Sequence, residues 1–170
     1  MSRDIELLHP KIAELCRATI IGASFDGIRI TVTQTRRTFE EQNELYAQGR
    51  TKPGPVCLHT GIARPVGSCP DHPFGLRVTN ARGGESFHNY DFAFDFAVLA
   101  SGQDPKPTWD RKIDVNEDDE PDYEQVGAIG EQLGLEWGGR WKREDLPHFQ
   151  KTFGLTIADL RAGKKPSEST

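Results

Sequence analysis

The sequence predicts one small domain that combines helices with short strands. The chain has 170 residues and a mass of 19.0 kDa, which is the size of a single globular domain. Hydrophobic residues make up 35% of the chain, enough for one core. Helical periodicities and short β-branched runs follow one another without an internal repeat or an interdomain linker. We therefore expect a single domain over residues 1–162, followed by a flexible polar tail over residues 163–170.

Charge and hydropathy exclude several classes of protein. The net charge is −5, whereas a general nucleic-acid binder carries a basic stripe. The first residues contain no long apolar segment and no small-residue cleavage site, so no secretory signal peptide is expected. No run approaches the roughly 20 apolar residues of a membrane span. We expect synthesis in the cytoplasm, no nucleic-acid partner and no membrane span.

The first part of the chain predicts a helix, a strand and a second helix. Apolar residues recur at helical spacing over residues 4–21, with Pro10 predicting a break or restart and Gly22 an end. Residues 28–34 alternate and are β-branched, as in a strand. Thr38 and Glu41 then form the pattern of a capping box, and we expect a helix from there to about Gln48.

The second part predicts further short elements. Residues 51–80 are rich in proline and glycine and are expected to be a loop, and residues 92–100 a buried strand. The acidic run at residues 116–120 is interpreted as a solvated loop, because the spacing of an EF-hand is absent. Pro121 opens a helix that Gly134 ends. Short strands at residues 135–137 and 147–150 and a helix at residues 157–161, capped by Thr156, complete the chain.

His88 and Asp95 are the first candidates for a metal site. They lie seven residues apart, and imidazole and carboxylate are ligands that Zn²⁺ accepts. His148 is the best candidate for a third ligand. Three protein ligands leave one position for water, as a hydrolytic zinc site requires. A carboxylate at Asp95, inside so apolar a strand, needs a metal, an arginine partner or an edge position.

Hydrolysis also needs a general base and a cation for the oxyanion. Asp145 lies three residues before His148 and is the candidate base, with Glu144 as its competitor. Arg37, at the end of the predicted strand 28–34, is the candidate cation. These residues indicate a zinc enzyme that hydrolyses a peptide bond.

Three blocks of sequence resemble the VanY-type zinc peptidases of the M15 group. They are Thr35–Thr51, with its segment TRRTFEEQNELYAQGRT; Val78–Tyr90, with VTNA and GESFHNY; and Gly134–Phe149, with GLEWGGRWK and DLPHF. The blocks occur in family order. They are most similar to the L-alanyl-D-glutamate endopeptidases of phage lysis systems.

The resemblance implies roles for individual residues. His88, Asp95 and His148 match the zinc ligands, Asp145 the catalytic base, and Arg37 the arginine that contacts substrate or oxyanion. Ser86 matches a serine that binds substrate near the metal, and Gln42 is a further substrate-binding candidate. The implied fold is a small α+β domain with a central antiparallel sheet flanked by helices.

The chain departs from the family in two places. Asp91 stands where glycine is usual, and aspartate tolerates a positive φ better than most residues do. Residues 55–77 form an insertion that contains Cys57, His59, Cys69 and His72. These residues suit a second, structural zinc; a Cys57–Cys69 disulfide and no special role are the alternatives.

The implied function is zinc-dependent cleavage of the L-Ala–D-Glu bond in peptidoglycan stem peptides, as by a phage endolysin. A D-Ala–D-Ala carboxypeptidase and a non-catalytic wall-binding module on the same fold are the alternatives. We expect a monomer whose partner is peptidoglycan. It would reach the cell wall after a holin-type opening of the membrane.

Overall fold

The computed structural model describes the whole chain except residues 60–61, 65–66, 68, 70 and 168–170. The side chains of residues 57–59 and 62–64 also lie outside the described part. Within it, five strands form one antiparallel sheet, with the order β1-β4-β7-β6 and with β5 paired to β4. The fold is therefore the small α+β domain with a central antiparallel sheet that the sequence predicts. The strands are β1 (Ile30–Gln34), β4 (Ala93–Leu99), β5 (Pro107–Thr108), β6 (Glu136–Trp137) and β7 (His148–Gln150).

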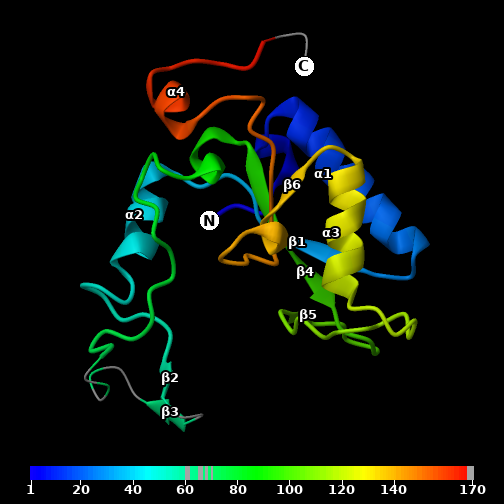
Figure 1. Ribbon diagram of the computed structural model, residues 1–170, viewed down its shortest axis with the longest axis horizontal. Helices are drawn as coiled ribbons and strands as arrows, with labels where there is room; N and C mark the ends of the chain where they lie inside the picture. The colour runs from blue at the N-terminus through cyan, green and yellow to red at the C-terminus, as the bar shows by residue number, and fades with distance from the viewer. Residues whose placement is uncertain (60–61, 65–66, 68, 70, 168–170) are drawn as a thin grey trace.

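Helices α1 (Pro10–Phe25) and α3 (Asp122–Gln132) lie side by side against the sheet (Figure 1). Pro10 is the first residue of α1, where its missing N–H costs nothing, so the chain restarts there after the 3₁₀ turn η1 (Ile5–Leu7). The predicted end at Gly22 is wrong. The helix continues to Phe25, and a Cβ at Gly22 would lie 2.8 Å from Ile129 of α3, so this glycine serves helix packing.

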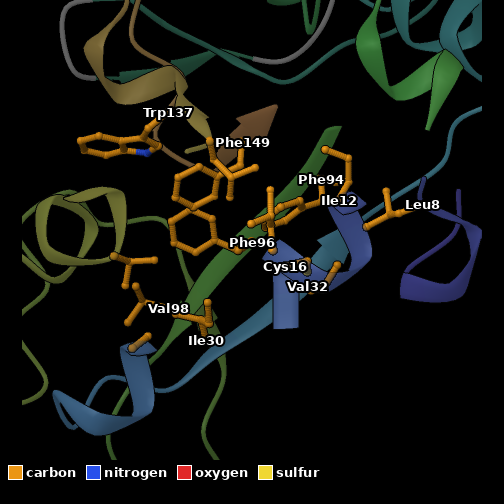
Figure 2. Close-up of a cluster of buried hydrophobic side chains, with 14 of the residues drawn as sticks. Leu8, Ile12, Cys16, Ile30, Val32, Phe94, Phe96, Val98, Trp137 and Phe149 are labelled. Carbon is orange, nitrogen blue, oxygen red and sulfur yellow. The ribbon is translucent and has the colours of Figure 1, made fainter. Parts of the chain in front are cut away.

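The core lies between these two helices and one face of the sheet (Figure 2). Alternate residues of β4 point into it, and β7 adds Phe149, whose ring stacks on Phe96 at 5.2 Å. Gly130 of α3 lets that ring approach the helix backbone, since a Cβ there would lie 2.3 Å from Phe149. The other face of β4 and β7 is thereby left for polar side chains. The buried members of the core include Leu8, Ile12, Cys16, Ile30, Val32, Phe94, Phe96, Val98, Trp137 and Phe149.

Helix α2 (Phe39–Ala47) lies on the opposite side of the molecule from α1 and α3 (Figure 1). Thr38 and Glu41 form the predicted capping box at its start. Two further 3₁₀ turns, η2 (Phe87–Tyr90) and η3 (Gly138–Arg140), and the last helix α4 (Ile157–Arg161) complete the elements. Thr156 caps α4 as the sequence predicts.

The insertion extends from α2 as a separate arm that carries the hairpin β2 (Cys57–His59) and β3 (Ile62–Arg64) (Figure 1). Its two ends are joined by backbone hydrogen bonds: Gly54 N donates to Phe74 O and Leu76 N donates to Pro55 O, both at 2.7 Å. Glycine is required at this neck, because a Cβ at Gly54 would lie 2.2 Å from the Leu76 carbonyl oxygen. The prediction of a loop throughout residues 51–80 is therefore wrong where this hairpin lies, and the insertion has a fixed base.

Candidate functional site

The sheet register brings Asp95 and His148 together. The two residues are direct partners in the β4–β7 pair, although 53 positions separate them in sequence. Both side chains lie on the face opposite Phe94 and Phe149, because neighbouring residues of a strand point to opposite faces. The sheet backbone therefore fixes two of the three predicted metal ligands.

His88 reaches the same point from η2. This turn ends at Asp91, whose φ of 66° is in the left-handed region, so the predicted tolerance of aspartate for this conformation applies here. The Asp91 carboxylate lies 3.3 Å from Arg36 Nε, which places its charge beside a cation. The backbone N–H of Arg37 donates to the carbonyl of His88 at 3.1 Å and ties the turn to the end of β1.

Three ligand atoms form a nearly equilateral triangle. His88 Nε2 lies 3.2 Å from Asp95 Oδ1 and 3.3 Å from His148 Nδ1, and His148 Nδ1 lies 3.0 Å from the same carboxylate oxygen. Among the described residues, these three make the group of histidine, cysteine and acidic side chains that can hold a metal ion. His88 and His148 are nearly inaccessible to solvent, with 2% and 7% exposure.

The outer hydrogen bonds determine which ring nitrogens carry protons. His88 Nδ1 lies 2.7 Å from the carbonyl of Thr35, which can only accept, so Nδ1 donates. His148 Nε2 lies 3.1 Å from Gln150 Oε1. The amide of Gln150 is oriented by Glu136, to which its Nε2 donates at 3.0 Å, so Oε1 accepts from His148. Each neutral ring therefore directs a lone pair into the triangle.

A metal ion fits these donors. Two imidazole lone pairs and a carboxylate oxygen face one another, and such atoms need a cation or an extra proton between them. Bonds of about 2.0–2.1 Å at a tetrahedral zinc place neighbouring ligand atoms about 3.3 Å apart, which the triangle matches. Burial by itself raises the pKa of Asp95, but positive charge on His88 and His148 and their hydrogen bonds outweigh it and hold that pKa below its usual range, as a bound cation would. The carboxylate is thus kept ionised.

Arg37 lies beside this centre and is almost fully buried. Its Nη1 donates to Gln42 Oε1 and its Nη2 to Gln34 Oε1, both at 2.7 Å. The same Nη2 lies 3.8 Å from Asp95 Oδ2. Nε has no hydrogen-bond partner among the described residues. The predicted cation is therefore held rigidly at the site with donor capacity to spare.

Gln42 lies behind Arg37. It is completely buried, and its Nε2 donates to the carbonyl of Ala81 at 2.8 Å while its Oε1 accepts from Arg37. Both ends of the amide are thus engaged by the protein. This placement favours a role in positioning Arg37 over the direct substrate contact predicted for Gln42.

Asp145 lies at the edge of the centre, on the turn that precedes β7. Its carbonyl accepts from His148 N at 3.1 Å, and its own N–H donates to Gly138 O at 2.9 Å. Loss of hydration raises the pKa of Asp145 above its usual value, and the charge of Asp95 adds to this, although His148, His88 and Arg37 act in the opposite direction. Glu144, the competing base, instead pairs with Arg111 at 3.0 Å. The geometry favours Asp145.

These residues line one pocket of about 460 Å³. Arg37, His88, Asp95, Asp145 and His148 all contribute to its wall. Ser86 also lines it, and the Ser86 hydroxyl caps no backbone group of η2. The described structure therefore brings every predicted residue of the catalytic centre except Gln42 to one cavity.

The pocket continues as a groove towards the insertion. A neighbouring hollow shares Thr79, Trp141 and Asp145 with it and ends at Arg143. A third hollow shares Arg143 and is walled by residues of the insertion and its end, including His72 and Arg77. The groove thus runs from the metal ligands to a basic end.

The predicted second metal site falls largely outside the described part of the chain. The side chains of Cys57 and His59 are among those not described. Cys69 Sγ lies 3.8 Å from His72 Nδ1, within one turn in which His72 N donates to Cys69 O. The structural zinc, the Cys57–Cys69 disulfide and the absence of a special role therefore all stay predictions.

Sequence reasoning missed the residues that support the ligands. Gln34 joins the site because the β1–β4 register shifts between Val32 and Gln34, so that Gln34 lies opposite Asp95. Gln150 and Glu136 orient His148 from β7 and β6. Gln150 had a detectable signal, since it follows His148 by two residues on the same strand face. The bulge had none.

The chain is similar to several known peptidases. A family described as D-alanyl-D-alanine carboxypeptidase, of the peptidase M15 group, matches residues 79–151. The peptidoglycan L-alanyl-D-glutamate endopeptidase CwlK of Bacillus subtilis is 39% identical over 144 residues, which cover 84% of this chain and 72% of CwlK. The crystal structure of the Serratia marcescens L-Ala D-Glu endopeptidase ChiX matches with a TM-score of 0.51 at 20% identity, over 88% of this chain and 84% of ChiX.

Proposed function

The chain belongs to the M15 family of peptidases, and we propose that it is a zinc-dependent endopeptidase that cuts the L-Ala–D-Glu bond of peptidoglycan stem peptides. The observation that carries the proposal is the convergence of two imidazole lone pairs and a carboxylate in one pocket. The similarity to CwlK, whose name states this bond, supports the choice of substrate.

His88, Asp95 and His148 would hold the zinc ion. Bound zinc would leave a position for water, lower the pKa of that water from about 16 towards about 7, and polarise the scissile carbonyl. The protein residues supply the remaining functions: the outer hydrogen bonds of Thr35 and Gln150 keep the two rings in the tautomers that the ion requires.

Asp145 acts as the general base. Its carboxylate accepts a proton from the attacking water and then passes it to the nitrogen of D-Glu as the peptide bond breaks. A raised pKa suits both steps, because the group must release the proton that it has taken. Its place in the pocket wall, three residues from His148, brings it to the reacting atoms.

Arg37 stabilises the negative charge that develops on the carbonyl oxygen. Gln34 and Gln42 hold its two terminal nitrogens, so little rearrangement is needed when the charge appears. Ser86 offers a hydroxyl to the peptide backbone from the same wall.

The basic end of the groove favours one orientation of the bound stem peptide. A stem peptide has its free carboxylates on D-Glu and on the residues that follow, while the muramoyl side is neutral at the peptide link. Arg77 and Arg143 line the far end of the groove and form no ion pair among the described residues. The half that begins with D-Glu therefore extends towards the insertion.

Cleavage of terminal D-Ala–D-Ala is the second candidate, because the matching family carries that description. The test is digestion of purified muropeptides by the zinc-loaded protein, followed by mass spectrometry. We expect muramoyl-L-Ala with a new free carboxylate and peptides that begin with D-Glu. Loss of single D-Ala residues would support the carboxypeptidase instead. No cleavage by an intact, zinc-loaded protein would overturn both and support a wall-binding module.

We also propose the structural zinc of the insertion, since Cys57, His59, Cys69 and His72 form a Cys2His2 set in a segment with little core of its own. Elemental analysis should give about two zinc ions per chain. A zinc content of two ions in the wild type and one in Cys69→Ser would support the structural site. One ion in both proteins would show that the insertion holds no zinc. Elemental analysis of protein prepared under oxidising and under reducing conditions would distinguish the structural zinc from a Cys57–Cys69 disulfide.

The route to the cell wall is a further proposal. The described residues contain no helix that is both long and apolar enough to cross a membrane. We propose synthesis in the cytoplasm as a monomeric phage endolysin, with access to the wall after a holin opens the membrane. Expression with and without a holin tests this: lysis only in its presence supports the route, and lysis without it contradicts it.

A further inference from the structure

The loop before α3 concentrates negative charge away from the proposed catalytic centre. Six of the nine residues from Asp114 to Asp122 are acidic. None of these six carboxylates forms an ion pair within the part of the chain that the structure describes. Such a cluster alone is compatible with a solvated surface, so a second observation is needed.

That observation is a buried carboxylate oxygen without a partner. Asp122 is completely buried, and its Oδ2 accepts from Val115 N at 3.0 Å. Its Oδ1 has no hydrogen-bond partner among the described residues. Asn116 Oδ1, in the same loop, is also buried without one. Unsatisfied buried oxygens are costly, and a bound cation would satisfy both.

The oxygen donors alternate along the chain. Counted from Asp114, oxygen-bearing side chains occur at 114, 116, 118, 120 and 122, which is the alternation of the first nine residues of an EF-hand loop. The full EF-hand pattern is absent, as the sequence analysis states, because Asp119 and Gln125 occupy its sixth and twelfth positions, but the alternation that begins at Asp114 is present. Asp119 takes the place of the usual sixth-position glycine and has a φ of 68°, the left-handed conformation that such a position requires.

Hydrogen bonds to the Asp114 carboxylate already fold the loop. Asp114 Oδ1 and Oδ2 accept from the backbone N–H groups of Asp118 and Asp119, at 3.2 and 3.0 Å. Gln125 stands at the twelfth position, where an EF-hand has a bidentate glutamate. Its Nε2 donates to Asp118 Oδ1 and to the carbonyl of Glu120 at 3.0 and 3.2 Å. An amide N–H group thus lies against oxygens that would face a cation.

We propose that residues 114–125 bind one Ca²⁺ ion through the side chains of Asp114, Asn116, Asp118 and Asp122 and the carbonyl of Glu120. An all-oxygen set on a flexible loop suits Ca²⁺, whereas Mg²⁺ demands stricter octahedral geometry and zinc prefers nitrogen and sulfur. Because Gln125 replaces the bidentate glutamate, the affinity should lie near that of extracellular calcium modules, with a Kd of about 10⁻⁴–10⁻³ M.

The ion would fasten neighbouring elements to each other. Asn116 Nδ2 donates to the carbonyl of Asp26, the residue that ends α1, at 2.9 Å. Asp122 is the first residue of α3. Burial, then the charges of Asp114 and Asp118, raise the pKa of Asp122, so its ionised form gains from a cation. Calcium should therefore stabilise the packing of α1 and α3.

The experiment measures Ca²⁺ binding by calorimetry and the melting temperature of zinc-loaded protein that has been cleared of calcium with EGTA. We expect one ion per chain and a rise in Tm of about 5–10 °C at a hundredfold excess over Kd. Asp118→Asn should weaken binding at least tenfold. Asp104→Asn, at an exposed acid paired with Lys106 outside the loop, should match the wild type.

Gln125→Glu provides a test that a folding defect cannot imitate. This substitution restores the bidentate ligand and should tighten Ca²⁺ binding by about tenfold or more. If Mg²⁺ and Ca²⁺ raised Tm equally, and still did so in Asp118→Asn, the ions would only be screening the negative charge of the loop. That result would overturn the proposal. Absence of calcium binding by both the wild type and Gln125→Glu at 10-millimolar concentrations, on the order of ten times the upper Kd, would do the same.

Discussion

Gln150 accepts a hydrogen bond from His148 Nε2 at 3.1 Å, while Glu136 fixes its amide. This contact selects the tautomer that leaves Nδ1 of His148 free for a metal. Gln150→Met keeps the volume but removes the acceptor. We expect zinc affinity to fall about 10–100-fold, as for other residues that orient metal ligands. Competition with a zinc chelator measures the change.

Thr152→Ala is a suitable control for Gln150→Met, because Thr152 lies partly exposed beyond β7 and donates to Glu136 Oε1 rather than to the oxygen that holds Gln150. It should bind zinc as the wild type does. If Gln150→Met retained the wild-type zinc affinity, the assigned tautomer of His148 would be wrong.

Asp145→Asn should separate metal binding from catalysis. The substitution removes the proton acceptor but none of the three ligand atoms. We expect zinc content to be unchanged and kcat to fall by about 10²–10⁴-fold. Glu144→Gln, at the competing carboxylate, should lose less than tenfold. A larger loss of kcat in Glu144→Gln than in Asp145→Asn would assign the base to Glu144.

His88→Ala should remove the catalytic zinc, because two ligands remain and Asp95 loses a neighbour that stabilises its ionised form. We expect the zinc content to fall by one ion per chain and activity to be lost. Elemental analysis beside circular dichroism distinguishes loss of metal from loss of fold. Full zinc content in a folded His88→Ala protein would contradict the ligand set.

Arg143→Gln tests the direction of the peptide in the groove. The probes are L-Ala–D-Glu–diaminopimelate peptides with free or amidated carboxylates, amidated separately on each residue. We expect wild-type kcat/KM to fall by about tenfold on amidation, the size of one charge-assisted hydrogen bond, and Arg143→Gln to lose this preference. Arg17→Gln, on α1, is the control.

Suppose that Arg143→Gln and Arg77→Gln both kept the wild-type ratio of kcat/KM between free and amidated peptides. The peptide would then lie in the groove in the opposite direction. Cleavage of the L-Ala–D-Glu bond would stand in that case, because the wild type measures it independently. The amidation site that matters identifies which carboxylate the arginines contact.

Gly130→Ala tests the packing of α3 on the sheet. The new methyl group would lie 2.3 Å from Phe149 Cε1, so the ring or the helix must move. We expect a loss of about 1–3 kcal/mol in the free energy of unfolding, against a helix-propensity gain of about 1 kcal/mol. Gln132→Ala, exposed at the helix end, should change stability by less than about 0.5 kcal/mol. Urea denaturation measures both.

The sequence predicts the features that depend on local chemistry. The capping box at Thr38, the cap at Thr156 and the strand around Asp95 are confirmed, and Asp91 has the positive φ that aspartate was expected to tolerate. The end of α1 was predicted wrongly because Gly22 serves contact with Ile129, which belongs to a distant segment. Long-range packing of this kind leaves no local trace.

The proposed ligands were predictable because family motifs mark them, and their proximity follows from strand pairing. The residues that orient these ligands were not predictable from the sequence. Gln34 faces Asp95 only because β1 carries a bulge, and no turn residue marks that shift. The alternation of oxygen donors that begins at Asp114 was present in the sequence, although the full EF-hand pattern is absent.

The closed neck of the insertion makes that segment exchangeable. Backbone hydrogen bonds join Gly54 to Phe74 and Leu76 to Pro55, so the chain enters and leaves the arm at nearly the same point. A segment attached in this way can be lengthened, shortened or grafted at small entropic cost, since doubling a loop costs only about 0.6 kcal/mol. The insertion is therefore a segment beside the groove whose length can change without changing the residues of the proposed catalytic centre.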